Sequence, residues 1–174
     1  MGGELATFGT GCFWGTQAAF EKVPGVTKTE VGYEGGSKVA PSYEDVLTDR
    51  TGHVEVVRVS FDPKKVSYPQ LLELFWIIHD PTEGNRQGND VGTQYRSVIF
   101  THSDAQQAEA EASKAEREQS GQYDREITTT IEPAQHFWPA EQYHQDYLEK
   151  NPGYYCHVNM GKVIEFIDQN FSKH

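Results

Sequence analysis

Apolar and polar residues follow one another along the chain in stretches whose spacing predicts interleaved strands and helices. Short apolar runs predict strands at residues 5–9, 26–33, 54–61, 97–101 and 126–132. Helical spacing predicts helices at residues 13–23, 71–78 and 140–149, a polar helix after Ser103, and a last helical turn or two at Val163, Ile167 and Phe171. The chain is therefore expected to mix both kinds of element.

Two of the predicted helices begin with capping residues. Ser67 stands three residues before Gln70, and Ser103 stands three residues before Gln106. This is the spacing of a capping box, in which a serine hydroxyl and a glutamine side chain bond the backbone N–H groups at the helix start. These pairs fix where the helices begin.

Long connections separate the predicted elements at two places. A Gly-rich polar loop at residues 34–42 leads to Tyr43, and a loop without periodicity covers residues 79–94. A loop of that length in a compact domain is commonly functional. The order of the elements predicts an α+β fold, a two-layer, ferredoxin-like sandwich with a mixed sheet, long loops and an irregular C-terminal tail.

Composition narrows the class of protein. The 174 residues suit one domain over residues 1–174, and nine Tyr, nine Phe and three Trp supply a core. The net charge of -11 would repel phosphate backbones and anionic membranes, so we expect neither nucleic acid nor membrane as a partner. Residues 1–11 lack the pattern of a signal peptide, and no stretch approaches ~18 apolar residues. We expect a cytoplasmic monomer.

The chain has two cysteines, Cys12 and Cys156, which form neither a disulfide framework nor a four-ligand metal set. Cys12 falls at the start of the helix predicted at residues 13–23. Backbone N–H groups and the helix dipole there would stabilise a thiolate, the nucleophilic form of cysteine. The alternative is that Cys12 is a small buried hydrophobe and that Phe13 and Trp14 are ordinary core residues.

Glu55 is a second candidate for chemistry. Strand alternation places it on the same face as Val57, Val59 and Phe61. Burial on such a face would raise the pKa of the carboxyl and make it a proton donor near neutral pH. The alternative is that Glu55 lies at the strand end, where it reaches solvent or pairs with His53 or Arg58.

Other polar groups give weaker signals. Residues 86–95 combine polar side chains with glycines, a composition suited to hydrogen bonding a small polar group. The histidines lack the short spacing of known metal sites, so we expect no metal. The histidines considered are His79, His136, His144 and His157.

The motif Gly11-Cys12-Phe13-Trp14-Gly15 resembles the signature of the A-type peptide methionine sulfoxide reductases. The similarity covers roughly residues 5–157, and its further segments follow in the same order. They are Val31-Gly32-Tyr33 with Gly35-Gly36, Pro41-Ser42-Tyr43, Thr51-Gly52-His53-Val54-Glu55, His79-Asp80-Pro81, the block from Arg86 to Asp90 and on to Tyr95-Arg96-Ser97, and His144-Gln145-Asp146-Tyr147-Leu148.

The resemblance implies a role for each matching residue. Cys12 would be the nucleophile that attacks the sulfur of an oxidised methionine, and Glu55 the acid that protonates the sulfoxide oxygen. Tyr43 and Tyr95 would bind that oxygen, and Asp90 would orient water or polar groups beside it. Phe13 and Trp14 would form the apolar pocket that takes the S-methyl group of the substrate.

The resemblance also implies how the enzyme is recycled. Reduction of the S epimer would leave a Cys12 sulfenic acid, and Cys156, in the tail at about residues 150–174, would condense with it to form a disulfide. Thioredoxin, or dithiothreitol in the test tube, would then reduce this disulfide, and no cofactor would be bound. Many relatives have further cysteines in a Gly-rich tail, whereas this chain has none after Cys156. The rival functions are a thiol peroxidase and a non-catalytic binder of oxidised methionine.

Overall fold

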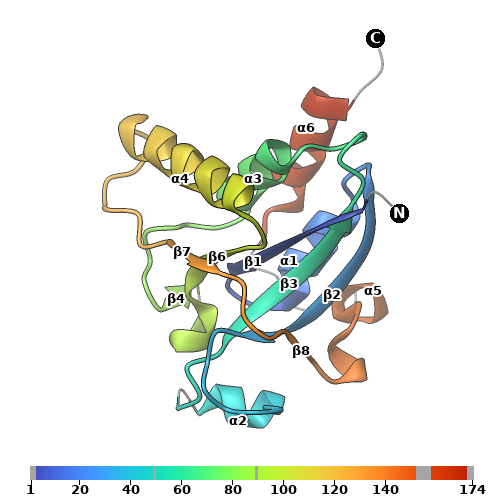
Figure 1. Ribbon diagram of the computed structural model, residues 1–174, viewed down its shortest axis with the longest axis vertical. Helices are drawn as coiled ribbons and strands as arrows, with labels where there is room; N and C mark the ends of the chain where they lie inside the picture. The colour runs from blue at the N-terminus through green and yellow to red at the C-terminus, as the bar shows by residue number, and fades with distance from the viewer. Residues whose placement is uncertain (1–2, 49, 89, 152–157, 172–174) are drawn as a thin grey trace.

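A six-stranded mixed sheet forms the centre of the protein (Figure 1). The computed structural model describes residues 3–48, 50–88, 90–151 and 158–171. The strands are β1 (Glu4–Thr10), β2 (Val26–Glu34), β3 (Val54–Phe61), β6 (Ser97–Thr101), β7 (Thr130–Pro133) and β8 (Trp138–Pro139). Their order is β7-β6-β1-β3-β2-β8, and every pair is antiparallel except β6 with β7. The expected mixed sheet is confirmed.

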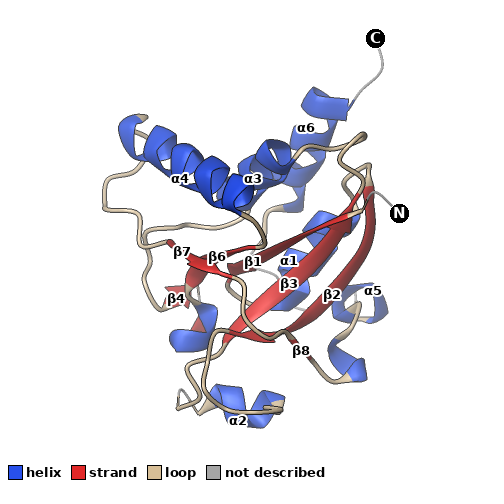
Figure 2. Cartoon of the chain, in the orientation of Figure 1, coloured by secondary structure: helices blue, strands red, loops and turns tan. Residues whose placement is uncertain are grey.

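Helices of very different length surround this sheet (Figure 2). The longer ones are α1 (Phe13–Glu21), α3 (Tyr68–Ile77), α4 (Asp104–Gln119) and α6 (Met160–Phe171). The short elements are α2 (Tyr43–Leu47), α5 (Tyr147–Lys150), the 3₁₀ turns η1 (Thr93–Tyr95) and η2 (Gln142–His144), and the hairpin of β4 (Arg86–Gln87) with β5 (Asp90–Val91). α1 packs on β1, β2 and β3, whereas α4 packs on β6 and β7. The nucleophile candidate therefore lies on a helix that covers the centre of the sheet.

Both faces of β3 are buried. Glu55, Val57, Val59 and Phe61 face α1, and the side chains of Val54 and Val56 join a second cluster with Phe100 and Phe137 on the other face. Burial on both sides explains why the first half of the strand is apolar at Val54, Val56 and Val57. It also explains why a charged residue in this strand needs a particular environment.

Side-chain caps set the beginnings of three helices. The Ser67 hydroxyl accepts a hydrogen bond from Gln70 N at 3.2 Å, and Ser67 N donates to Gln70 Oε1 at 2.9 Å, so the predicted capping box is confirmed. The Ser103 hydroxyl accepts from Gln106 N at 3.1 Å, but Gln106 Oε1 accepts from His102 N at 3.0 Å rather than from Ser103 N, so only half of the second predicted box forms. A further capping box, of Ser42 with Asp45, begins α2.

Several predicted elements differ from the structure. The strand expected at residues 126–132 begins only at Thr130, and the helix expected at 140–149 is replaced by η2 and α5, because Asp146 adopts a left-handed conformation between them. The helical turns predicted at Val163, Ile167 and Phe171 are confirmed, whereas the irregular tail expected from about residue 150 is wrong for residues 160–171. These residues form α6, whose Val163 and Phe166 are buried in the main core.

No helix in the described ranges combines the length and the apolar character that crossing a membrane requires.

Candidate active site

Cys12 lies where the central strand β1 passes into α1. Gly11 takes a positive φ of 105° and turns the chain, so that Cys12 becomes the N-cap residue of the helix. Its side chain is half-buried. At this position the first backbone N–H groups of the helix and its dipole favour a negative charge, which stabilises a thiolate.

Glu55 lies directly against the start of the same helix. Its Oε1 accepts a hydrogen bond from the backbone N–H of Phe13 at 3.2 Å, and its side chain is 1% exposed. Its Oε2 is buried and makes no hydrogen bond with the described residues. Burial, with a smaller contribution from Asp90, raises the pKa of Glu55 to about 8. The carboxyl is therefore largely protonated at neutral pH, with a buried oxygen available for another ligand.

The alternative partners of Glu55 are engaged elsewhere. Arg58 binds Glu30 at 2.9 Å, on the other side of the strand. The His53 ring bonds Gly36 N and the Lys38 carbonyl instead. Neither residue neutralises the carboxyl, which supports its interpretation as a buried acid.

Tyr43 and Tyr95 bring two phenol groups to the same place. Tyr43 begins α2, Tyr95 ends η1, and the two side chains are close enough for Tyr43 to affect the pKa of Tyr95. Burial first, and then the nearby Glu55 and Cys12, raise the pKa of both phenols far above the ordinary range. Both hydroxyls remain protonated and can donate a hydrogen bond to an anionic or strongly polar oxygen.

Asp90 adds a third polar group from the β5 hairpin strand. Its Oδ2 is buried without a hydrogen-bond partner in the described part of the chain, and burial raises the pKa of the carboxyl. Asp90 is close enough to Glu55 to raise the pKa of that residue. Its neighbour Asn89 lies outside the described residues.

Aromatic rings form the apolar side of the site. The Phe13 ring is 1% exposed and lies 5.7 Å from Tyr33, 6.4 Å from Tyr43 and 5.3 Å from His144, measured between ring centroids. Trp14 stacks on Tyr147 with centroids 3.8 Å apart and planes 9° apart. A small apolar group would find a preformed contact surface here.

The structure thus brings together seven of the eight predicted site residues, and the eighth, Cys156, lies outside the described residues. Comparison with known proteins identifies the family of the chain. The family model described as "Peptide methionine sulfoxide reductase" matches residues 4–174.

The chain belongs to the peptide methionine sulfoxide reductase family.

Individual relatives are similar over nearly their whole length. The peptide methionine sulfoxide reductase MsrA of Methanoculleus marisnigri is 59% identical over 153 residues, which cover 88% of this chain and 93% of the relative. The reduced form of Mxr1 from Saccharomyces cerevisiae superimposes with a TM-score of 0.85 at 40% identity, over 90% of this chain and 91% of Mxr1. A complex of Mxr1 with Trx2 matches with a TM-score of 0.59 at 29% identity, over 83% and 84% of the two chains.

Two residues of this reductase site were not predicted to belong to it. His144 is 1% exposed, and its Nδ1 accepts a hydrogen bond from Trp14 Nε1 at 3.0 Å. Glu141 accepts hydrogen bonds from the Tyr33 hydroxyl and from Tyr43 N, each at 3.0 Å. The segment from 144 to 148 resembled the family, but the contact of His144 with Trp14 joins residues 130 positions apart, so their spacing in the chain gave no sign of it.

Proposed function

We propose that this protein reduces methionine sulfoxide to methionine, with Cys12 as the nucleophile. The observation that supports this most directly is the contact of the buried, protonated Glu55 with the backbone N–H of Phe13, the residue next to Cys12. A thiolate and an acid are thereby held at one helix start, as a reaction that needs both requires. The family of the chain supports the same assignment.

In the proposed reaction Cys12 attacks the sulfur of the sulfoxide. Negative charge would accumulate on the oxygen, and Glu55 supplies the proton that relieves it. Tyr43 and Tyr95 bind this oxygen, and Asp90 orients water or polar groups beside it. The oxygen atom passes to Cys12, so the products are a methionine thioether and a Cys12 sulfenic acid.

The S-methyl group of the substrate packs against the aromatic side of the site. Phe13 is held by neighbouring rings, and Trp14 is fixed by Tyr147 and His144. The substrate is the S epimer of methionine sulfoxide, in proteins or free, since the two epimers are reduced by separate enzymes.

Cys156 completes the cycle in this proposal. Its thiol condenses with the Cys12 sulfenic acid and releases water, which leaves a disulfide. Thioredoxin then reduces the disulfide by thiol exchange, and dithiothreitol can replace it in vitro. The solved complex of the relative Mxr1 with Trx2 supports a thioredoxin as partner. No bound cofactor takes part in these steps.

We further infer a cytoplasmic, monomeric protein that repairs oxidised proteins under oxidative stress. We also infer that its central layers are ferredoxin-like, a two-layer sandwich within a single domain. The order β6-β1-β3-β2, with α1 between β1 and β2 and α3 between β3 and β6, supports this inference.

One assay separates the proposal from its rivals. The protein is incubated with racemic dabsylated methionine sulfoxide and dithiothreitol, and the products are resolved by epimer. We expect consumption of the S epimer alone. A thiol peroxidase would instead consume hydrogen peroxide and leave the sulfoxide, and a non-catalytic binder would form a stable complex without loss of thiols.

A further inference from the structure

The guanidinium of Arg96, the residue after Tyr95, donates hydrogen bonds to two backbone carbonyls. Its Nη1 donates to Thr93 O and its Nη2 donates to Gly52 O, both at 3.0 Å. In the described ranges no carboxylate lies within 4.0 Å of this group. The planar fork of an arginine can bind two such acceptors at a fixed angle. Arg96 thus ties η1 to the turn at residues 51–53.

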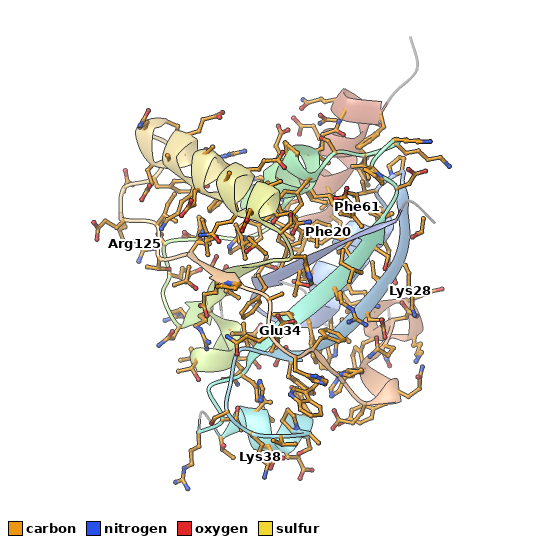
Figure 3. All side chains as sticks on the ribbon, in the orientation of Figure 1. Phe20, Lys28, Glu34, Lys38, Phe61 and Arg125 are labelled. Carbon is orange, nitrogen blue, oxygen red and sulfur yellow. The ribbon has the colours of Figure 1, made fainter. Side chains whose placement is uncertain are left out.

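His53 makes the matching connection from the other side of this turn. Its Nδ1 accepts a hydrogen bond from Gly36 N at 3.0 Å, so its Nε2 carries the hydrogen and donates to the Lys38 carbonyl at 2.7 Å. Lys38 is on the loop that leads from β2 into α2 (Figure 3). His53 thus ties this loop to the turn.

The loop and the turn approach each other too closely for a side chain at residue 36, so only glycine fits there. A Cβ atom on Gly36 would lie 2.4 Å from both His53 N and Thr51 O. In addition, Ser37 N donates to Thr51 O at 2.8 Å. Several hydrogen bonds therefore join the loop to the turn, and either segment must break them to move alone.

The bonded loop and turn connect the three segments that carry the proposed oxygen-binding groups. The loop leads to Tyr43, the turn leads into β3 and Glu55, and Arg96 holds η1 with Tyr95. We propose that Arg96 and His53 are positioning residues that set the separation of the Tyr43 and Tyr95 hydroxyls above Glu55. This proposal rests on the proposed reduction of methionine sulfoxide, because it concerns the hydrogen bonds from the two tyrosines to the sulfoxide oxygen.

A double-mutant cycle tests this role. The variants are Arg96→Met, Tyr95→Phe and the double variant, and the readout is the single-turnover rate with a peptide methionine sulfoxide. Misplacing a donor by about 1 Å can slow a reaction roughly 100-fold, so we expect Arg96→Met to lose roughly 10- to 100-fold. With the Tyr95 hydroxyl already removed, Arg96→Met should cost less than about threefold more, because it acts through that hydroxyl.

Two controls separate positioning from general stability. Arg117→Met removes an arginine on α4 that donates to Gln122 Oε1, at 3.2 Å, and it should change the rate less than about twofold, as surface substitutions usually do. Arg96→Lys keeps the charge but not the fork, and it should recover only part of the loss. If Arg96→Met does not fold, the same cycle is run with Arg96→Lys.

The outcomes are distinct. If the losses from Arg96→Met and Tyr95→Phe multiply in the double variant while the unmodified protein is active, Arg96 is merely structural and the proposal is wrong. If the unmodified protein reduces no sulfoxide, the proposed function itself fails. A second cycle, of His53→Gln with Tyr43→Phe, should show the same non-multiplicative result.

Discussion

Glu55 joins the fold and the chemistry at a single residue. The carboxyl is surrounded by the apolar side chains that build the core, yet its Oε1 accepts a hydrogen bond from the backbone N–H of Phe13, next to the proposed nucleophile Cys12. Burial raises its pKa to about 8, so the protonated form is the one that the folded protein holds at neutral pH. Burial is thus the main cause that keeps Glu55 protonated as a potential proton donor.

Replacement of Glu55 by Gln tests this interpretation. The amide fills the same space but cannot donate an acidic proton, so the single-turnover rate should fall by roughly 100-fold or more, with little change in substrate affinity. The rate of the unmodified protein should decline as the pH rises through about 8, where Glu55 loses its proton. A rate that stays constant from about pH 6 to about pH 10 would contradict the assignment.

Although Glu55→Gln should lower the rate, it should preserve or raise the stability of the folded protein at high pH. A carboxyl whose pKa is higher in the folded state than its ordinary 4.5 contributes stability at low pH that is lost as the pH rises through about 8. Glu55→Gln removes this loss. The variant should therefore melt at the same or a higher temperature than the unmodified protein above pH 8, and a lower melting temperature there would show that the charged form is stabilised.

His144 controls the orientation of Trp14. In His144→Phe the ring is retained but the acceptor for Trp14 Nε1 is lost, so the indole is less firmly held. We expect the KM for a peptide sulfoxide to rise roughly tenfold, since leaving a buried donor without its partner costs about 1–3 kcal/mol. Tyr143→Phe, next to it in the chain, is the control. An equal rise in KM for both variants would show that His144 has no particular role.

At the level of single elements, α2 places Tyr43 through its capping box. Ser42→Ala removes this cap from a helix of five residues, and Ser67→Ala removes the equivalent cap from α3. Each substitution should lower the free energy of unfolding by about 1 kcal/mol. Ser42→Ala alone should also slow sulfoxide reduction. If the two variants have the same rate, the position of Tyr43 does not depend on its helix cap.

The contact of α1 with α5 carries an excess of negative charge. Glu21 of α1 lies beside Asp146 and Glu149, and one carboxylate oxygen of each residue lies within 4.8 Å of those of the other two. The Thr29 hydroxyl also donates to Glu21, at 3.1 Å. Partial burial and then Asp146 raise the pKa of Glu21 to about 7. This pKa lies above its ordinary 4.5, so the contact loses stability as the pH rises through about 7.

Glu21→Gln should therefore stabilise the protein in a pH-dependent way. The variant should melt at a higher temperature than the unmodified protein at pH 8 and show no such gain at pH 4.5, where the acid is already protonated. Glu111→Gln, an exposed position on α4, serves as the control. A gain at both pH values, or an equal gain from Glu111→Gln, would rule out repulsion between α1 and α5.

Local signals decided which elements could be predicted. The predicted bounds of the strands at 54–61 and 97–101 match the structure, because β-branched and aromatic residues predominate in both. The starts of α3 and α4 followed from their serine caps. The helix α2 and the β4–β5 hairpin were missed, since both are too short to show a period and are stabilised by contacts with other segments.

The same distinction applies to the site. Cys12 could be placed at a helix start from spacing alone, and Glu55 could be placed on the face of a strand. The sequence could not show that Phe13 N binds Glu55, because 42 positions separate them. The parts played by His144 and Glu141 depend on the path of residues 134–147 around β2, which no local pattern indicates.

On the scale of the whole molecule, the sheet brings distant segments to Cys12. β1 and β3 are neighbours, so the ends that carry Cys12 and Glu55 meet, and β6 on the other side of β1 brings Tyr95 with it. α2 and η2 contribute Tyr43 and His144. The proposed catalytic residues therefore depend on the pairing of β1 with β3 and β6 rather than on any one loop.

The central claim is that Cys12 takes the oxygen of methionine sulfoxide and that Cys156 resolves the product. The most direct measurement is a single turnover of the fully reduced protein with a peptide methionine (S)-sulfoxide and no added reductant, followed by thiol counting and peptide mapping. We predict one methionine formed for every two thiols lost, with the Cys12 peptide linked to the Cys156 peptide, and no methionine from Cys12→Ser. Methionine formed by Cys12→Ser, or by the unmodified protein without any loss of thiols, would contradict the account.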